Sequence, residues 1–257
     1  MNFAAEMAVS INANLLLLNV YQVPVSVTDM PVVVVSTDDL RKTSETNLEH
    51  IKNELTNAHQ GKIKIYTETS MGDVSDELEE ACNKIHPFAV VMGTHSSGVE
   101  RVLFGSTTLR TARNLKWPLI VVPPNKKFGN GIKKIGFASD FIKVVETTPV
   151  HFIKDIVKAF GAELHVLHVD HDNKHFKPTT PEESVMLQTL LEDLDPTYDF
   201  IDNEDIEDGI NEFADKNNLD LLITIPKKHG LFETLFKHSS TKELVTQSHV
   251  PVMCVHE

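Results

Sequence analysis

An internal repeat constrains the fold of this chain more than any other feature of the sequence. The segment 103–122 aligns without a gap with 236–255, and an earlier segment, 3–20, aligns with 152–169. The offset is larger for the earlier pair, so the first copy holds extra residues in its middle. Self-similarity over this length indicates one structural unit present twice. We therefore expect two domains, at 1–126 and 127–257.

Each copy alternates apolar strands with helices. Continuous apolar strands separated by helices are typical of βαβ units and of a parallel sheet buried on both faces. The expected fold class is α/β, with two doubly wound parallel five-stranded sheets of strand order 3-2-1-4-5. In the second copy the expected strands are 132–139, 163–169, 198–201, 219–225 and 250–255, and the expected helices are 146–160, 181–194, 206–217 and 239–248.

The first copy lacks a counterpart of the opening strand of the second. Met1 aligns with Val150, which already lies inside the first expected helix. In the order 3-2-1-4-5 the opening strand is central, so its loss would expose two strand edges. Two explanations are open. We favour a longer protein in which Met1 is an internal methionine; the alternative is another segment that fills the gap.

The charge balance argues against two classes of partner. The chain of 257 residues has a formal net charge of -13, which disfavours nucleic acid and anionic lipid. Its two cysteines form no CxxC motif, so free thiols in a cytoplasmic protein are expected. The sequence contains neither an apolar run of about 20 residues nor a signal peptide, so no membrane association is expected.

The stretch 90–122 has the layout of a phosphate-binding loop between a strand and a helix. Glycine lets backbone N–H groups approach an anion, and a helix N-terminus adds unsatisfied donors. Ser106 and Thr107 could donate hydroxyl hydrogen bonds to a phosphate. The alternative is structural: Gly93 forms a strand-end turn and Ser106 caps the helix.

With this loop, the two copies resemble a tandem universal stress protein, whose loop motif is Gly-x2-Gly-x9-Gly-(Ser/Thr). Here Ser96 stands in place of the second glycine, the spacer is one residue short, and Gly98 follows two positions later. The segment 137–141 resembles the family's first strand, whose aspartate contacts the nucleotide. The resemblance implies binding of ATP or AMP, with these candidate contacts: Val20, Gly93, Thr94, Ser96, Gly98, Gly105, Ser106, Thr107 and Asp140.

The loop of the second copy departs further from the motif. Gly93 aligns with Pro226 and Gly105 with His238, although Ser239 remains. Proline has no backbone donor, and histidine is poorly suited to a positive φ. The second copy is therefore expected to be degenerate for nucleotide binding and to act as a scaffold or a partner surface.

Two further clusters are weighed against structural alternatives. The histidines and aspartates of 164–176, including His168, His171 and His175, could ligate zinc, but a polar loop after a strand is the preferred interpretation, and no metal is expected. The acidic run 202–209 lacks the calcium-loop spacing and is expected to cap a helix. No pattern indicates a catalytic residue.

The sequence favours a cytoplasmic stress-response module that binds ATP or AMP weakly through the first copy and is not an enzyme. The alternatives are a nucleotide-free interaction protein with vestigial pockets, a flavin-binding redox protein and an ATP-hydrolysing enzyme. The final strands of the two copies are expected to pair within the chain. Homodimerisation of whole chains and unidentified protein partners are also expected.

Overall fold

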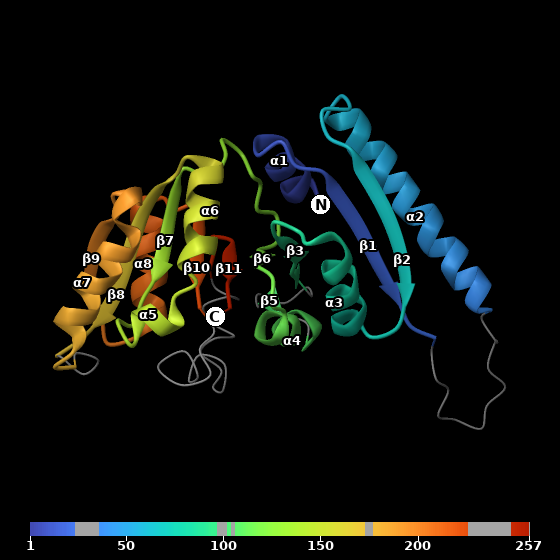
Figure 1. Ribbon diagram of the computed structural model, residues 1–257. Coiled ribbons are helices and arrows are strands. Elements are labelled where there is room, and N and C mark those ends of the chain that lie inside the picture. Colours follow the sequence, from blue (N-terminus) through green and yellow to red (C-terminus); the bar gives the residue numbers. More distant parts are fainter. Residues whose placement is uncertain (24–35, 97–101, 104–105, 173–176, 226–247, 257) are drawn as a thin grey trace, which may run out of the picture. The chain divides into compact units, whose positions relative to one another are not determined.

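The computed structural model describes residues 1–23, 36–96, 102–103, 106–172, 177–225 and 248–256 (Figure 1). The chain divides into two compact units, Met1–Pro87 and Phe88–Glu257, and each is described by itself. In the described part of the chain, no helix is both long and apolar enough to span a membrane.

Unit 1 is a two-stranded parallel sheet with helices. Its elements are α1 (Asn2–Ser10), β1 (Leu15–Tyr21), α2 (Thr37–Ala58), β2 (Ile65–Met71) and α3 (Val74–Ile85). The start of α2 follows from Ser36, whose hydroxyl accepts a hydrogen bond from the Asp38 N–H at 3.2 Å. Small residues of α1 and leucines of α2 pack with β1 and β2 in one core, which contains Ala5, Ala8, Leu17, Leu48, Leu55, Ile63 and Ile65.

Unit 2 is built on a seven-stranded sheet of order β3-β6-β11-β10-β7-β8-β9. Counted along the second repeat, β9-β8-β7-β10-β11 is the order 3-2-1-4-5, and these five strands are parallel. The α/β fold with parallel sheets is thus confirmed. The strand bounds are β3 (Val90–Gly93), β6 (Leu119–Val122), β7 (Lys134–Ala138), β8 (Glu163–Asp170), β9 (Thr197–Asp202), β10 (Leu221–Thr224) and β11 (Val252–Cys254).

The two repeats are joined through their final strands. β6 of the first repeat pairs antiparallel with β11 of the second, with Val121 opposite Val252 and Leu119 opposite Cys254. Every other neighbouring pair in this sheet is parallel. The expected pairing of the final strands within the chain is therefore confirmed.

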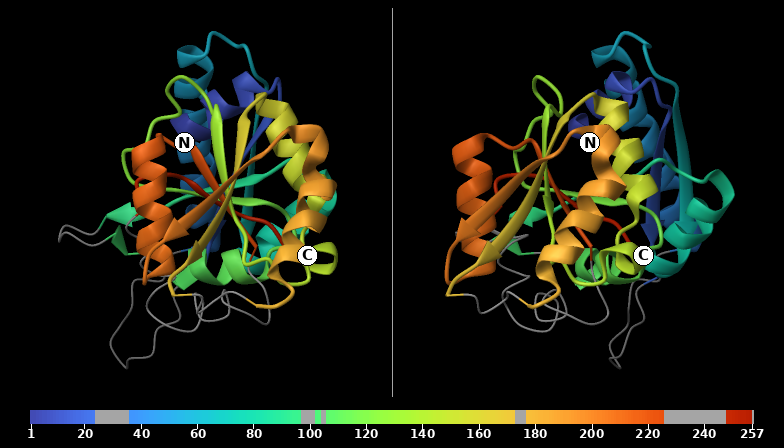
Figure 2. Two further views of the ribbon diagram at one scale, coloured as in Figure 1. Left: turned by 90° about the vertical axis from the view of Figure 1, so that its left-hand side faces the viewer. Right: turned by 60° about the vertical axis from the view of Figure 1, so that its left-hand side comes forward.

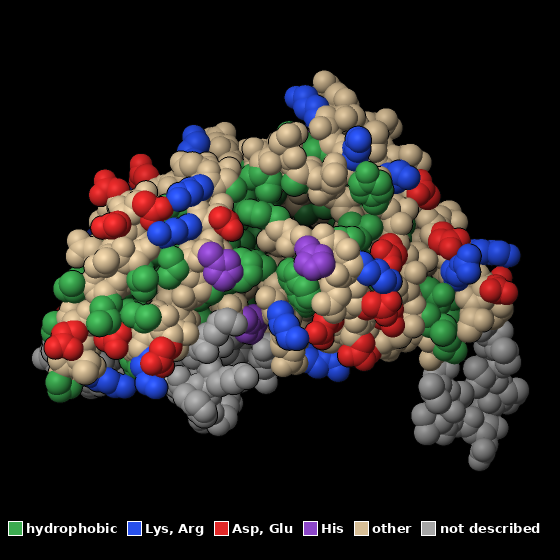
Figure 3. Space-filling model, in the orientation of Figure 1, with side chains coloured by type: hydrophobic (Ala, Val, Ile, Leu, Met, Phe, Trp, Pro, Cys, Tyr) green, Lys and Arg blue, Asp and Glu red, His purple; other side chains and the backbone are tan. Residues whose placement is uncertain are grey.

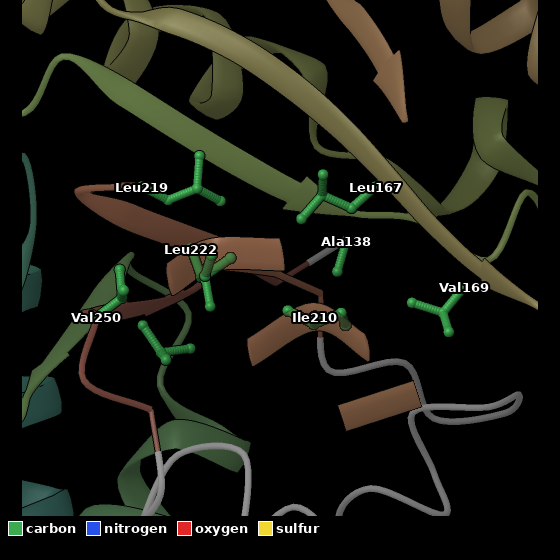
Figure 4. Close-up of a cluster of buried hydrophobic side chains, with 9 residues drawn as sticks. Ala138, Leu167, Val169, Ile210, Leu219, Leu222 and Val250 are labelled. Atoms are coloured by element: carbon green, nitrogen blue, oxygen red, sulfur yellow. The ribbon is translucent and has the colours of Figure 1, made fainter. Parts of the chain in front are cut away.

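Helices cover both faces of the second-repeat sheet (Figure 2). α6 (Val150–Phe160), α7 (Thr180–Leu191) and the short η1 (Glu192–Leu194) lie on one side, and α8 (Ile206–Asn217) lies on the other. Beneath α8, branched side chains from neighbouring strands fill the core (Figure 4). This cluster comprises Ala138, Leu167, Val169, Ile210, Ala214, Leu219, Leu222, Val250 and Val252.

One expected helix is interrupted. The sequence pattern predicts a continuous helix over 146–160, whereas the structure has α5 (Val144–Thr147) and then α6. Thr148 between them is extended, at φ -98° and ψ 114°. The residue before a proline avoids the helical region, and Pro149 cannot donate a helical hydrogen bond, so the helix restarts after it.

The acidic run 202–209 is a helix cap, as expected. The Asp205 carboxylate accepts the backbone N–H groups of Glu207 and Asp208 at 2.9 and 3.0 Å, which fixes the start of α8. The expected helix 239–248 lies almost wholly outside the described residues. Figure 3 shows acidic and basic side chains interspersed over the visible face, with hydrophobic groups between them.

No described segment fills the place of the opening strand in the first repeat. Among the described residues, β1 pairs only with β2, and β3 pairs only with β6. In the second repeat, β7 occupies that place and pairs with both β8 and β10.

Candidate functional site

The candidate site of the first repeat begins where β3 ends at Gly93. The ladder continues past this residue, because the Thr94 N–H donates to the Val122 carbonyl at 3.1 Å. Gly93 is not among the glycines with a positive φ, and a Cβ built on it would meet no atom of the described residues within 4 Å. Among the described residues, neither a positive φ nor a crowding side chain accounts for a glycine at this position.

A short antiparallel ribbon follows Gly93 where the sequence suggests an open loop. β4 (His95–Ser96) pairs with β5 (Val102–Leu103), with Ser96 opposite Val102. The ribbon places Ser96 in regular backbone rather than in a glycine-like turn. Gly98 and Gly105 lie outside the described residues.

The helix of the motif, α4 (Ser106–Asn114), begins at Ser106. Because α4 connects β3 to the parallel strand β6, its N-terminus lies on the side where β3 ends. Thr107 in its first turn is half-buried, and the following Thr108 is buried. The first N–H groups of an α-helix have no partner within the helix and can bind an anion.

Val20 belongs to a different unit from the other first-repeat candidates. It lies in β1 of unit 1, next to the last residue of the strand, and is half-buried. Beside it, the Asn19 side chain accepts a hydrogen bond from the Ser44 hydroxyl of α2. The candidates Gly93, Thr94 and Ser96 and the start of α4 lie in unit 2.

The second repeat carries its candidate, Asp140, just past the end of β7. Asp140 is only 3% exposed, and its Oδ1 accepts the Ile142 N–H at 3.1 Å. The next residue, Phe141, is 1% exposed and adopts a left-handed φ of 49°. The carboxylate is therefore enclosed by the protein itself and is engaged in an Asx-type turn.

The residue after Asp140, Phe141, belongs to a group of aromatic rings. The ring of Phe141 lies 4.8 Å from that of His168 on β8 and 6.1 Å from that of Phe200 on β9. His168 is 4% exposed, and its Nδ1 donates to the Ser139 carbonyl oxygen at 3.0 Å. Sequence reasoning singled out His168 only as a metal candidate and missed Phe141. The proximity of these residues depends on the pairing of β7, β8 and β9.

The two repeats differ in the surroundings of their candidate residues. In the first, no atom of the described residues lies within 4 Å of a Cβ built on Gly93, and α4 begins at Ser106. In the second, Asp140, Phe141 and His168 are buried, and the rings of Phe141 and His168 lie 4.8 Å apart. The second-repeat loop positions Pro226, His238 and Ser239 lie outside the described residues.

The histidine cluster forms ion pairs. His171 Nδ1 lies 2.8 Å from Asp202, and its Nε2 lies 3.4 Å from Asp172 and 3.5 Å from Glu204. The hydrogen bond to Asp202, with these neighbouring charges, raises the pKa of His171 above 6.5. No group of three or more metal-ligating side chains is placed to hold a metal ion within the described ranges, and His175 falls outside them.

Similarity to known proteins identifies the family to which this chain belongs. The sequence pattern of the Universal stress protein family matches residues 1–123 and again 131–256. The chain thus belongs to the universal stress protein family and contains two copies of its characteristic domain.

Individual relatives agree with this assignment. A universal stress protein of Methanocaldococcus jannaschii is 37% identical over 71 residues, a match that covers 27% of this chain and 42% of that protein. A universal stress protein from Archaeoglobus fulgidus has a crystal structure similar to this one, with a TM-score of 0.74 at 18% identity, covering 98% of this chain and 92% of that one. A functionally unknown protein from Pseudomonas aeruginosa gives a TM-score of 0.63 at 14% identity, covering 95% and 82%. Identities this low establish the fold alone.

Proposed function

We propose that the first repeat binds an adenine nucleotide, ATP or AMP, weakly, and that the protein is a cytoplasmic stress-response module rather than an enzyme. The second repeat serves as its scaffold and as a surface for protein partners. Homodimerisation of whole chains belongs to the same proposal.

The observation that carries this proposal is the end of β3. Among the described residues, neither the backbone conformation nor the packing at position 93 requires a glycine, yet Gly93 stands at the first glycine of the family's loop motif. A side chain at this position would occupy the space through which a phosphate approaches the backbone. The first turn of α4 provides additional N–H donors on the same side.

The test is chromatography of nucleotides released by denaturing the purified full chain, compared across matched variants. Gly105→Asp places a carboxylate in the motif of the first repeat, where it repels phosphate. His238→Asp makes the same change at the aligned position of the second repeat. We expect ATP or AMP from the unchanged protein and from His238→Asp, and almost none from Gly105→Asp.

A second candidate function is a nucleotide-free interaction protein. The buried Asp140 and the rings of Phe141 and His168 favour it for the second repeat. If no variant releases nucleotide and added ATP or AMP produces no saturable shift in the melting temperature, this second function replaces the first. Flavin absorbance in the purified protein would support a redox role instead.

A further inference from the structure

The end of the second repeat contacts the helix of the first-repeat motif. His256 follows β11, and its Nε2 lies 2.9 Å from the carbonyl oxygen of Ala112 in α4. A carbonyl oxygen only accepts hydrogen bonds, so Nε2 carries the hydrogen and donates it. The two residues are 144 positions apart in the sequence, and the bond therefore joins the two repeats.

This bond closes the C-terminal end of α4. The helix ends at Asn114, so Ala112 lies in its last turn. The last four carbonyl groups of an α-helix have no partner within the helix, and a histidine side chain can satisfy one of them. The neighbouring Thr111 carbonyl accepts the Leu115 N–H at 2.9 Å. Two carbonyl groups of the last turn are thus bonded, and one of these bonds comes from the other repeat.

α4 depends on contacts of this kind because it is short. It has nine residues, whereas an isolated helix shorter than about 12–15 residues is marginal in water. Thr111 and Ala112 are 1% and 4% exposed, so the last turn is packed into the protein. Packing and the bond from His256 together fix this end of α4, and the position of this end determines where the rest of the helix lies.

The reverse contact is ruled out by the sequence. In the repeat alignment His256 corresponds to Pro123, which follows β6. Proline has neither a side-chain donor nor a backbone N–H, so Pro123 cannot donate to a carbonyl group of the second repeat. The support given by this position therefore runs in one direction, from the second repeat to the motif helix of the first.

We propose that His256 is a positioning residue for the nucleotide site of the first repeat. By fixing the C-terminal end of α4, it holds the N–H groups of the first turn, at Ser106 and Thr107, where a phosphate approaches. This role presupposes the proposed nucleotide binding. It adds that the affinity of the first repeat for ATP or AMP depends on a side chain of the second.

The test uses the full chain, freed of nucleotide, and three variants. His256→Phe keeps an aromatic ring but removes the donor, whereas His256→Gln retains an N–H donor. His249→Phe, at an exposed histidine of the same repeat, is the matched control. Calorimetry measures the binding of ATP and AMP, and amide hydrogen exchange is measured in the absence of nucleotide.

We expect His256→Phe to weaken nucleotide binding about fivefold, because the hydrogen bond that orders α4 is lost. Exchange at the Leu115 amide should become faster by a similar factor. The Leu222 amide, which donates to the Pro251 carbonyl at 2.9 Å, should exchange at an unchanged rate. His256→Gln should restore most of the affinity, and His249→Phe should bind like the unchanged protein.

Three results overturn this role. Equal affinities of His256→Phe and the unchanged protein would show that the contact does not position the site, although nucleotide binding itself would stand. Faster exchange at Leu222 as well as at Leu115 would mean that His256 supports the whole sheet rather than α4. If the unchanged protein binds neither ATP nor AMP, the proposed function fails and this role fails with it.

Discussion

The aligned strands of the two repeats, β1 and β8, have different neighbours. β8 lies inside the seven-stranded sheet, whereas β1 is paired on one side only among the described residues. β1 is the more uniformly aliphatic of the two at its start, yet its leucines are mostly half-buried. Neighbouring strands, more than a strand's own hydrophobicity, therefore decide how far it is buried.

The sharpest test of this difference is the matched pair Leu167→Ala and Leu18→Ala. Leu167 is 1% exposed in the core beneath α8, so its truncation should cost about 3–5 kcal/mol of unfolding free energy. Leu18 is half-buried, and its truncation should cost about 1–2 kcal/mol. Urea unfolding followed by far-UV circular dichroism measures both. Equal costs would mean that β1 is as tightly packed as β8.

A second pair compares glycines. A Cβ on Gly136 in β7 would lie 2.6 Å from Leu219 Cδ1 and 2.9 Å from Leu222 Cδ2, so Gly136→Ala should cost about 1–3 kcal/mol. Gly93→Ala should change stability by less than about 0.5 kcal/mol, because its Cβ would meet no atom of the described residues within 4 Å. Thermal unfolding of the two variants checks this. A large loss for Gly93→Ala would make that glycine structural and weaken the nucleotide proposal.

Each unit contains one of the two cysteines, so the reaction rates of the two thiols compare how readily the units open. Cys82 lies on α3 in unit 1 and Cys254 on β11 in unit 2, and burial raises their pKa values to about 11 and about 12. Each thiol reacts only when its surroundings open. In single-cysteine variants at neutral pH, Cys82 should react at least about tenfold faster than Cys254. Comparable rates would mean that the two units open together.

The smallest expected effect concerns His171. Its pKa is raised in the folded protein, chiefly by the hydrogen bond to Asp202, so it stabilises the fold below about pH 6.5. This contribution is lost as the pH rises through the folded pKa. His171→Gln should remove that part of the pH dependence, and His50→Gln, on an exposed helix pair with Glu54, is the control. An NMR titration of His171 giving a pKa at or below 6.5 would contradict it.

Local signals made much of the second repeat predictable. Periodicity located its strands and α8, and the acidic run at Asp205 indicated the cap. Thr148–Pro149 also indicates the break between α5 and α6, but the apolar pattern continues across these two residues and predicts one helix. These features depend on residues close in sequence, so a single sequence can report them.

The surroundings of Asp140 could not be predicted in the same way. Phe141 and His168 meet because β7 and β8 pair in one particular register, with Ala138 opposite Leu167. The ribbon of β4 and β5 likewise depends on pairing across a loop. In the first repeat, the motif singled out Gly93, but only the structure shows that no atom of the described residues lies within 4 Å of a Cβ built on it.

The antiparallel pairing of β6 with β11 has a consequence for assembly. Two separate domains joined this way would come apart on dilution, but here both strands belong to one chain and their effective concentration is fixed by the polypeptide. The thermal stability that this pairing gives should not depend on protein concentration. The same pairing uses the edges of both final strands, so these edges are not available to a second chain.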